Sequence, residues 1–359
     1  MILTIYDRFK IRKVEYFSNF QLSLGYDQFG STFSFSFYFD PNNPDHKELA
    51  CVTHYHTCTV QHNDEILMRG FALSQGFTYN PEKQLATISG YSTPGILEDC
   101  VIPPDLYPLQ SDGVSLFNIA EKLTQPWKLK YGLNVVVDPS VADRVNKPFK
   151  KITASEGSTI ASFLAEMAQQ KRVIVSHNEK GELLLTEAKT TGAPLIEFDF
   201  TQGLIPGTDF QMSFDGQGMH SHIYVMGQAS PDGGNAREAM VMNPYCPIVY
   251  RPTVVSQSSG DDIDSNEVAM RALASELEGL TLKIETDRWI VDGKIIKPNN
   301  IITIIAPELY IYKKATWFIR SIDFTGDAEK TTATLNCVIP EVVNGKYPVS
   351  IFQGINMHA

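Results

Sequence analysis

Apolar and polar residues alternate in short stretches through the first part of the chain. Phenylalanines stand at every second position from Phe33 to Phe39, separated by Ser34, Ser36 and Tyr38. A repeat of two residues places these phenylalanines on one face of a β-strand. Turn-forming residues interrupt the segment at 41–44, 63–64 and 80–83. Short strands with turns between them predict a small β-barrel or sandwich over residues 1–98.

The spacing of the apolar residues changes after a proline-rich linker near residue 105. Apolar positions three or four residues apart predict one helix that follows Asp112 and ends before Pro126, and a second helix over 158–170. Short strands complete this segment, at 133–137, 173–176 and 183–186. Helices mixed with short strands predict an α+β domain over residues 105–194.

Strand-like stretches return in the last part of the chain, and one helix interrupts them. Asp264 stands where a helix N-cap is expected, and Glu267 three residues later fits a capping box. The expected strands are 223–225, 248–250, 280–285, 301–305, 316–324 and 331–339. We therefore predict a second barrel domain over 195–343 and a tail over 344–359. The predicted fold is mixed and mainly β, with two small barrel-like domains flanking the α+β domain.

The charge of the chain argues against a nucleic-acid-binding protein. The 359 residues carry a net charge of −11, and the densest basic stretch, at 8–13, is short and mixed with apolar residues. Proteins that grip DNA or RNA usually display a basic patch, because contacts to phosphates supply most of the affinity. The sequence therefore predicts no specific binding to nucleic acid, and the stretch 8–13 is better interpreted as a solvated strand face.

Three further features bear on where the protein is made. No stretch approaches the ~18 consecutive apolar residues of a membrane span, so we expect no membrane association. Charged residues interrupt the N-terminus too early for a secretory signal. The five cysteines are scattered and odd in number, which favours a reducing cytoplasm over a disulfide framework.

A group of histidines and cysteines near residue 55 raises the question of a metal site. His54 and His56 share one face of a predicted strand, and Cys51, Cys58 and His62 are nearby in sequence. A zinc site needs four nitrogen or sulfur ligands, often in closely spaced pairs. Because no second clear pair follows, polar strand residues are the better interpretation. We predict no metal and no cofactor.

The acidic residues give no catalytic motif. Asp261, Asp262 and Asp264 lack the spacing of a calcium loop and fit a solvated loop that ends in a helix cap. Two pairs of carboxylates are close in sequence: Glu98 with Asp99, and Glu276 with Glu278. Glycoside cleavage requires a defined spatial separation, which a sequence does not show. Motifs of serine hydrolases, zinc proteases and nucleotide-binding loops do not occur. We therefore predict no catalytic residue and no enzymatic activity.

The tail is unusually apolar for the end of a chain, where loose segments are commonly polar. Tyr347, Val349, Ile351 and Phe352 are its candidate docking residues. Two interpretations remain open at this point: the tail docks on a neighbouring protein, or it packs against its own chain.

Three stretches carry a resemblance to a known family. Gly90–Cys100 is a glycine-led strand end followed by a leucine, acids and a cysteine. Gly157–Glu187 combines a helix with a hairpin that has Gly181 in its turn, and Glu267–Val338 runs from a helix through Trp289 to a final pair of strands. These stretches resemble the Mu-like phage baseplate hub proteins. That family is grouped with the T4 baseplate hub, the late control protein D of P2-like phages, and the N-terminal part of type VI secretion spike proteins.

The resemblance implies a mechanical role in a contractile phage tail. Members of the family form trimers, in which two similar barrel domains per subunit give a pseudo-sixfold ring. Such a ring joins a sixfold tail tube to a threefold central spike, contacts tube-initiator and other baseplate proteins, and lets DNA pass through its centre. The implied location is the tail baseplate of the virion, with assembly in the host cytoplasm. We expect a neutral or acidic lumen, because a basic one would retain the DNA backbone.

Two other classes of function remain as alternatives. A tail-associated cell-wall hydrolase would need a concave site with two convergent acids or a metal. A receptor- or glycan-binding tail module would expose aromatic side chains in a groove, and the three tryptophans are more often core or interface residues. A hub of a phage-derived injection device is a close variant of the main hypothesis.

Overall fold

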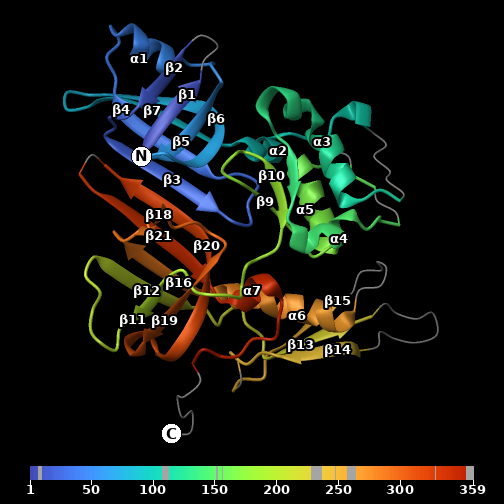
Figure 1. Cartoon of the computed structure of the whole chain (residues 1–359). Coiled ribbons are helices and arrows are strands. Elements are labelled where there is room, and N and C mark those ends of the chain that lie inside the picture. Colours follow the sequence, from blue (N-terminus) through green and yellow to red (C-terminus); the bar gives the residue numbers. More distant parts are fainter. Residues whose placement is uncertain are drawn as a thin grey trace. The chain divides into compact units, whose positions relative to one another are not determined.

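The computed structural model describes residues 1–6, 10–106, 113–150, 153–155, 157–227, 237–246, 248–256, 264–327 and 329–352. The chain forms two compact units. Unit 1 comprises Met1–Glu187 with Ile322–Thr332, and unit 2 comprises Ala188–Ser321 with Ala333–Ala359. Each unit contains β-sheet, and helices are fewer (Figure 1).

Unit 1 begins with strands and one short helix, followed by helices and a small sheet. The first part contains β1 (Ile2–Tyr6), β2 (Ile11–Val14), β3 (Asn19–Gly25), β4 (Thr32–Tyr38), α1 (Pro44–Leu49), β5 (His56–His62), β6 (Glu65–Tyr79) and β7 (Gln84–Ser92). The second part contains α2 (Ile96–Asp99), α3 (Leu116–Tyr131), β8 (Val135–Val137), α4 (Ala142–Asn146), α5 (Ile160–Gln170), β9 (Ile174–His177) and β10 (Leu183–Thr186).

The large sheet of unit 1 has the order β3-β4-β7-β6-β5-β1-β2, and the end of β20 (Ile311–Gly326) that belongs to this unit lies next to β3. Phe33, Phe35 and Phe37 are buried on one face, as the alternation predicts. Phe39 lies beyond the end of β4 and is half-buried, with its ring centroid 5.1 Å from that of Phe77. The strand prediction is confirmed for the first three of the four phenylalanines.

The same sheet is open, and among the described strands it does not close into the expected barrel. The free edge of this sheet is β2, whereas β20 continues the pairing to β21, and β2 is paired with neither of these strands. A groove beside β2 is instead bordered by α1 and the end of β4, and Arg12 of β2 forms an ion pair with Glu48 of α1. The side chain of Asn43 caps α1, and Pro44 lies in the first turn of this helix. The sequence pattern predicts only a turn at 41–44, and this helix was not predicted.

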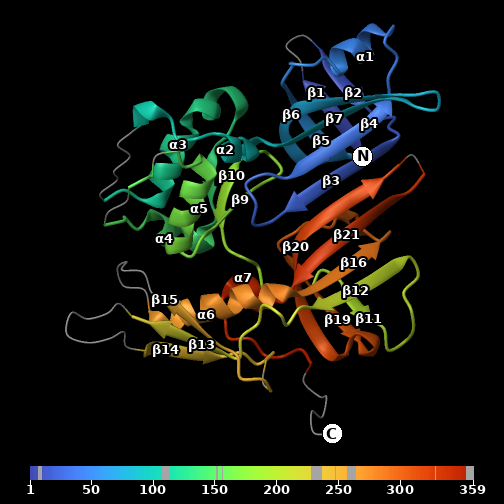
Figure 2. The same ribbon diagram turned by 180° about the vertical axis from the view of Figure 1, so that it is seen from behind.

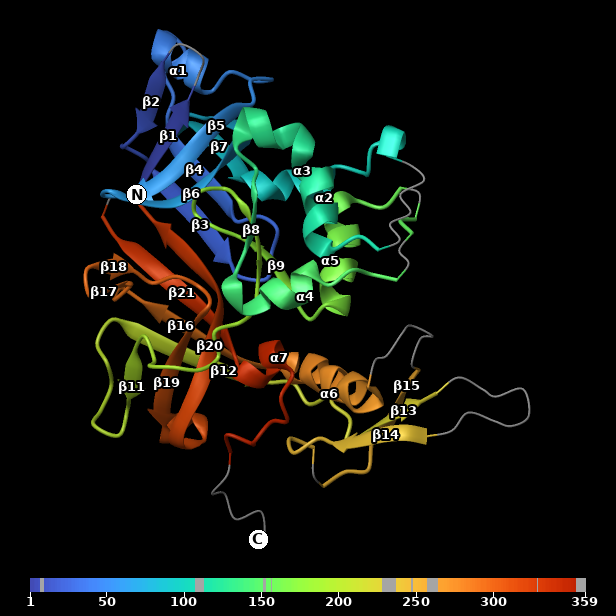
Figure 3. The same ribbon diagram turned by 45° about the vertical axis from the view of Figure 1, so that its right-hand side comes forward.

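Helices α3 and α5 pack against the small sheet β8-β10-β9 (Figure 3). The hairpin of β9 and β10 and the helix α5 confirm the sequence predictions for this segment. The prediction that α3 ends before Pro126 is wrong, because α3 continues to Tyr131 and is closed by Gly132 at a φ of 72°. A proline inside a helix costs about 3 kcal/mol. Packing of Trp127 on the apolar core and the left-handed glycine cap offset that cost.

The small sheet is joined to the large sheet of unit 1 by a partly buried histidine and a turn glycine. The Nε2 atom of His177 lies 2.6 Å from Ser31 Oγ, and its Nδ1 atom lies 3.0 Å from the carbonyl oxygen of Gln28. A carbonyl accepts only, so Nδ1 carries the proton and Nε2 accepts the Ser31 hydroxyl. Gly181 has a φ of +78°, and a Cβ atom there would meet Thr93 Oγ1 at 2.7 Å. Only glycine fits this contact without strain.

Unit 2 contains a second large sheet and a smaller one. Its elements are β11 (Glu197–Asp199), β12 (Thr208–Phe214), β13 (His222–Met226), β14 (Arg237–Met242), β15 (Pro252–Ser256), α6 (Ser265–Glu276), β16 (Leu280–Thr286), β17 (Ile290–Val291), β18 (Lys294–Ile295), β19 (Asn300–Ala306), β20, β21 (Thr331–Val338) and α7 (Pro340–Asn344). The large sheet has the order β12-β16-β21-β20-β19-β11, and its two end strands are not paired, so this sheet also stays open among the described residues.

The smaller sheet of unit 2 has the order β14-β13-β15, and α6 lies against it (Figure 2). The predicted cap of α6 is confirmed, since the Asp264 side chain accepts a hydrogen bond from the Asn266 amide. No helix among the described residues is both long and apolar enough to span a membrane.

Removing the central phenylalanine of β4 tests the dry face of the unit 1 sheet. Phe35 is fully buried and contacts the rings of Phe17 and Phe20. We expect Phe35→Ala to lower the free energy of unfolding by about 3–5 kcal/mol, measured by chemical denaturation, because it leaves a cavity. The matched control is Tyr38→Ala on the exposed face of the same strand, with a loss below about 1 kcal/mol. Equal losses in the two variants would contradict the assigned faces.

The histidine contact predicts a dependence of stability on pH. Burial lowers the pKa of His177 below its ordinary value of 6.5. The folded state therefore binds fewer protons than the unfolded state, and its stability is complete above about pH 6.5 and is lost as the pH falls below it. His177→Gln keeps a polar group but removes the titration. We expect denaturation curves at neutral and mildly acidic pH to differ less for this variant than for the wild type, and an unchanged difference would refute the role of His177.

Candidate functional site

The large sheet of unit 2 has one apolar and one polar face. Along β16, Leu280, Leu282 and Ile284 are fully buried, whereas Thr281 and Lys283 between them are exposed. This alternation follows from the two-residue repeat of a strand. The polar face is therefore the side of this sheet on which functional contacts are possible.

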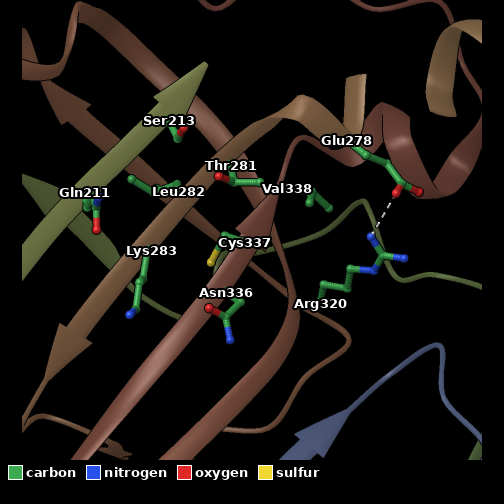
Figure 4. A pocket seen from close by; sticks show the side chains of 10 residues that line it. All are labelled: Gln211, Ser213, Glu278, Thr281, Leu282, Lys283, Arg320, Asn336, Cys337 and Val338. Carbon is green, nitrogen blue, oxygen red and sulfur yellow. Dashed lines mark ion pairs between the residues drawn. The ribbon is translucent and has the colours of Figure 1, made fainter. Parts of the chain in front are cut away.

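Strand register extends that face across three strands in parallel rows. The rows are Asp209–Glu285–Thr334, Gln211–Lys283–Asn336 and Ser213–Thr281–Val338. Figure 4 shows the last two rows around a shallow hollow of about 360 Å³. At its margin, Arg320 Nη1 lies 3.5 Å from Glu278 Oε2, and both side chains are partly exposed. The three rows contain two carboxylates and one ammonium group, so they carry no excess of positive charge.

The large sheet of unit 1 has a polar face built on the same principle. Its rows are Gln21–Ser34–Ser89–Ser74 and Asn19–Ser36–Thr87–Gly76. Neighbouring hydroxyls pair within this face, as Ser36 Oγ lies 2.8 Å from Thr87 Oγ1. These two rows consist of hydroxyl and amide side chains with one glycine, and none of their members is ionisable. We call the rows of unit 1 and unit 2 together the polar sheet faces.

The polar sheet faces have the chemistry of a hydrated surface that binds other molecules only weakly. Hydroxyls and amides exchange hydrogen bonds with water, and the net gain of any one bond is about 1 kcal/mol. Tight attraction of a phosphate backbone requires lysine or arginine, which the unit 1 rows lack. These faces therefore suit passage or loose contact better than specific binding.

Two of the histidines near residue 55 lie close together. The rings of His54 and His56 lie 5.5 Å apart at the start of β5, and burial raises the pKa of the Cys58 thiol. Within the described residues, no three side chains among His, Cys, Asp and Glu come together as metal ligands.

The acidic candidates have structural partners. Asp99 accepts a hydrogen bond of 2.6 Å from the Tyr91 hydroxyl, and burial raises the pKa of its neighbour Glu98. Glu276 holds the main-chain amide and the ring of His220, each at 2.8 Å, and Glu278 pairs with Arg320. Asp264 caps α6. Asp261 and Asp262 lie outside the described residues.

The tail packs on unit 2 up to residue 352. The Tyr347 hydroxyl donates to the carbonyl oxygen of Met242 at 3.0 Å, and the Tyr245 hydroxyl donates to that of Val349 at 3.3 Å. Ile351 donates its amide to the Tyr245 hydroxyl, and Phe352 lies against the ring of Tyr245. Burial raises the pKa of Tyr245 to about 12. Tyr347 and Val349 remain more than half exposed, and docking of a partner on them stays a prediction.

The fold is that of phage tail proteins. The solved structure of the 43 kDa tail protein of prophage MuSo2 from Shewanella oneidensis superposes with a TM-score of 0.78 at 19% identity, over 96% of this chain and 100% of that one. A component of the type VI secretion system of E. coli superposes with a TM-score of 0.55 at 8% identity, over 97% and 80% of the two chains. That structure is described as similar to the T4 tail proteins gp27 and gp5.

Sequence comparison finds similarity to baseplate hub proteins. Residues 94–187 match the family described as baseplate hub protein gp44-like, second domain. The chain is 22% identical to the baseplate hub protein gp44 of Escherichia phage Mu over 274 residues. The aligned region covers 70% of this chain and 67% of that protein. The resemblance to the Mu-like phage baseplate hub proteins is confirmed. Together the comparisons support a structural protein of the tail baseplate of a virion.

We expect the ion pair of Glu278 and Arg320, at the margin of the polar face of unit 2, to contribute little to stability. Glu278→Gln should lower the free energy of unfolding by less than about 1 kcal/mol, because solvent screens the partly exposed pair with Arg320. Ile284→Ala on the dry face of β16 is the matched control and should cost about 2–5 kcal/mol. Denaturant titration of both variants measures these losses, and a cost of Glu278→Gln as large as that of the control would show that this face is not solvated.

Proposed function

We propose that this protein is the baseplate hub of a contractile phage tail and acts as a trimer. The trimer adapts the sixfold tail tube to the threefold central spike, and it contacts tube-initiator and other baseplate proteins. Each chain contributes two one-sided sheets, so three chains supply six. The DNA passes through the centre of the ring without specific binding. Assembly takes place in the host cytoplasm, before the baseplate enters the virion.

The observation that supports this proposal is the pair of polar sheet faces. Each large sheet buries one face and leaves the other polar, and both sheets are open among the described strands. Open sheets expose edges that a neighbouring chain can pair with or cover. A channel for DNA needs walls that are wet and not basic, and the rows described above have that composition.

The family comparisons support the same assignment independently of the faces. The match over residues 94–187 is to a hub domain, and the E. coli neighbour is itself described as structurally similar to T4 tail proteins. A mechanical adapter needs no catalytic site, because its work is to match symmetries through closing interfaces.

Labelling with thiol reagents of two sizes tests whether the polar sheet faces line a channel. Cys51, Cys100 and Cys246, which are partly exposed, are first replaced by serine. Gln21→Cys or Lys283→Cys then places one thiol on a polar sheet face, and Leu129→Cys places one on α3, where Leu129 is 99% exposed. In the assembled protein we expect a small maleimide to label all three variants. A maleimide on a gold particle wider than a DNA duplex should label the Leu129→Cys variant alone.

Denaturation should restore labelling of every variant by the large reagent, to one thiol more than in the parent, whose denatured chain exposes only Cys58 and Cys337. The proposal fails if the large reagent labels the Gln21→Cys and Lys283→Cys variants in the native assembly as fast as the Leu129→Cys variant.

A further inference from the structure

Among the described residues, one face of the small sheet of unit 2 is apolar and largely exposed. On one side, Ile223 and Val225 of β13 are fully buried beneath α6, as are Ala269 and Leu273 of the helix. Side chains alternate along a strand, so the next residues of each strand point to the opposite side of the sheet. In an ordinary two-layer domain, that opposite side carries polar side chains.

Here the opposite side is apolar instead. Before the register shift between Val225 and Met226, its side chains lie in two rows, His222–Met242–Pro252 and Tyr224–Met240–Val254. Met240 is 42% exposed, Met242 53% and Val254 61%. Tyr250 is 68% exposed, and its ring centroid lies 5.2 Å from that of His222. We call these seven residues the outer face.

The borders of the outer face extend its apolar character. Ile248 and Val249, which precede Tyr250, are 77% and 58% exposed. Tyr347 of the tail reaches the end of β14 through its hydrogen bond to Met242. The two rows of the outer face contain no aspartate, glutamate, lysine or arginine, and the next row, beyond a bulge in the register, is Met226–Arg237–Ser256. Large exposed apolar patches are rare on monomers and mark interaction sites.

The composition of the outer face is that of a permanent interface. Interface cores are enriched in tyrosine and methionine and depleted of lysine, glutamate and aspartate. Methionine side chains are flexible and polarisable, so they adapt to an apposed surface. A transient, steered contact would instead display charges that attract its partner.

We infer that the outer face is covered by a second copy of this chain in the assembled protein. Each copy carries a net charge of −11, so copies repel one another wherever their acidic surfaces meet. A contact between copies is therefore most stable where both sides lack charge, and the outer face meets this requirement. The inference rests on the proposed trimer. In a threefold ring, each copy uses one surface to contact a different surface of the next, so disrupting the outer face breaks every contact of the ring.

The test is the molar mass of the full chain in solution, measured by light scattering during gel filtration. Three chains of 40.1 kDa give about 120 kDa for the wild type. The double variant Met240→Glu with Val254→Glu places carboxylates on both sides of Tyr224, and we expect it to elute as a 40.1 kDa monomer with an unchanged circular dichroism spectrum. Leu129→Glu on α3 is the matched control and should keep the wild-type mass.

A milder pair, Met242→Gln with Val254→Thr, covers the case in which the charged variant does not fold. It should weaken association by at least tenfold, read from the concentration at which the trimer dissociates. If the wild type forms trimers and a folded outer-face variant still forms them equally well, the inference is wrong and the proposed hub stands. A wild type that is monomeric at high concentration contradicts the proposed trimer itself.

Discussion

The structure depends on one constraint: the two sides of each β-strand must differ chemically. Burial of apolar surface stabilises the fold by about 25 cal/mol per Å², so every sheet needs one side that is apolar and covered. In both large sheets this leaves a polar side, made of hydroxyls and amides in unit 1 and of mixed charges in unit 2. In the small sheet of unit 2, the second side is apolar as well, and this exception is what points to a subunit contact.

Much of the local structure could be predicted from the sequence because its determinants are local. The alternation of Phe33, Phe35 and Phe37 specifies a strand, the turn at 178–181 specifies a hairpin, and Asp264 specifies a helix start. The errors came from interactions between distant residues. Helix α3 continues past Pro126, where Trp127 packs against the apolar core. A helix forms at 44–49, next to the turn that the local pattern indicated, and its Glu48 pairs with Arg12 of β2.

The candidate site was less predictable than the fold. Alternation shows that a strand has a polar side, but the rows of the polar sheet faces require the pairing of strands more than 40 residues apart, such as β12 with β16. The outer face was missed for a similar reason. The sequence pattern did not predict β14, and the pairing of β14 with β13 and the position of α6 on the other side of the sheet are needed to see that Met240 and Met242 are exposed. The contacts of Tyr347 and Phe352 with unit 2 likewise depend on residues far away in sequence.

Single-particle imaging of the full chain at high concentration tests the central claim most directly. The account predicts a ring of three copies with an axial hole, in which the rows of Gln21 and Lys283 face the hole. A compact single-chain particle would contradict it, and so would a ring whose polar sheet faces point away from the axis.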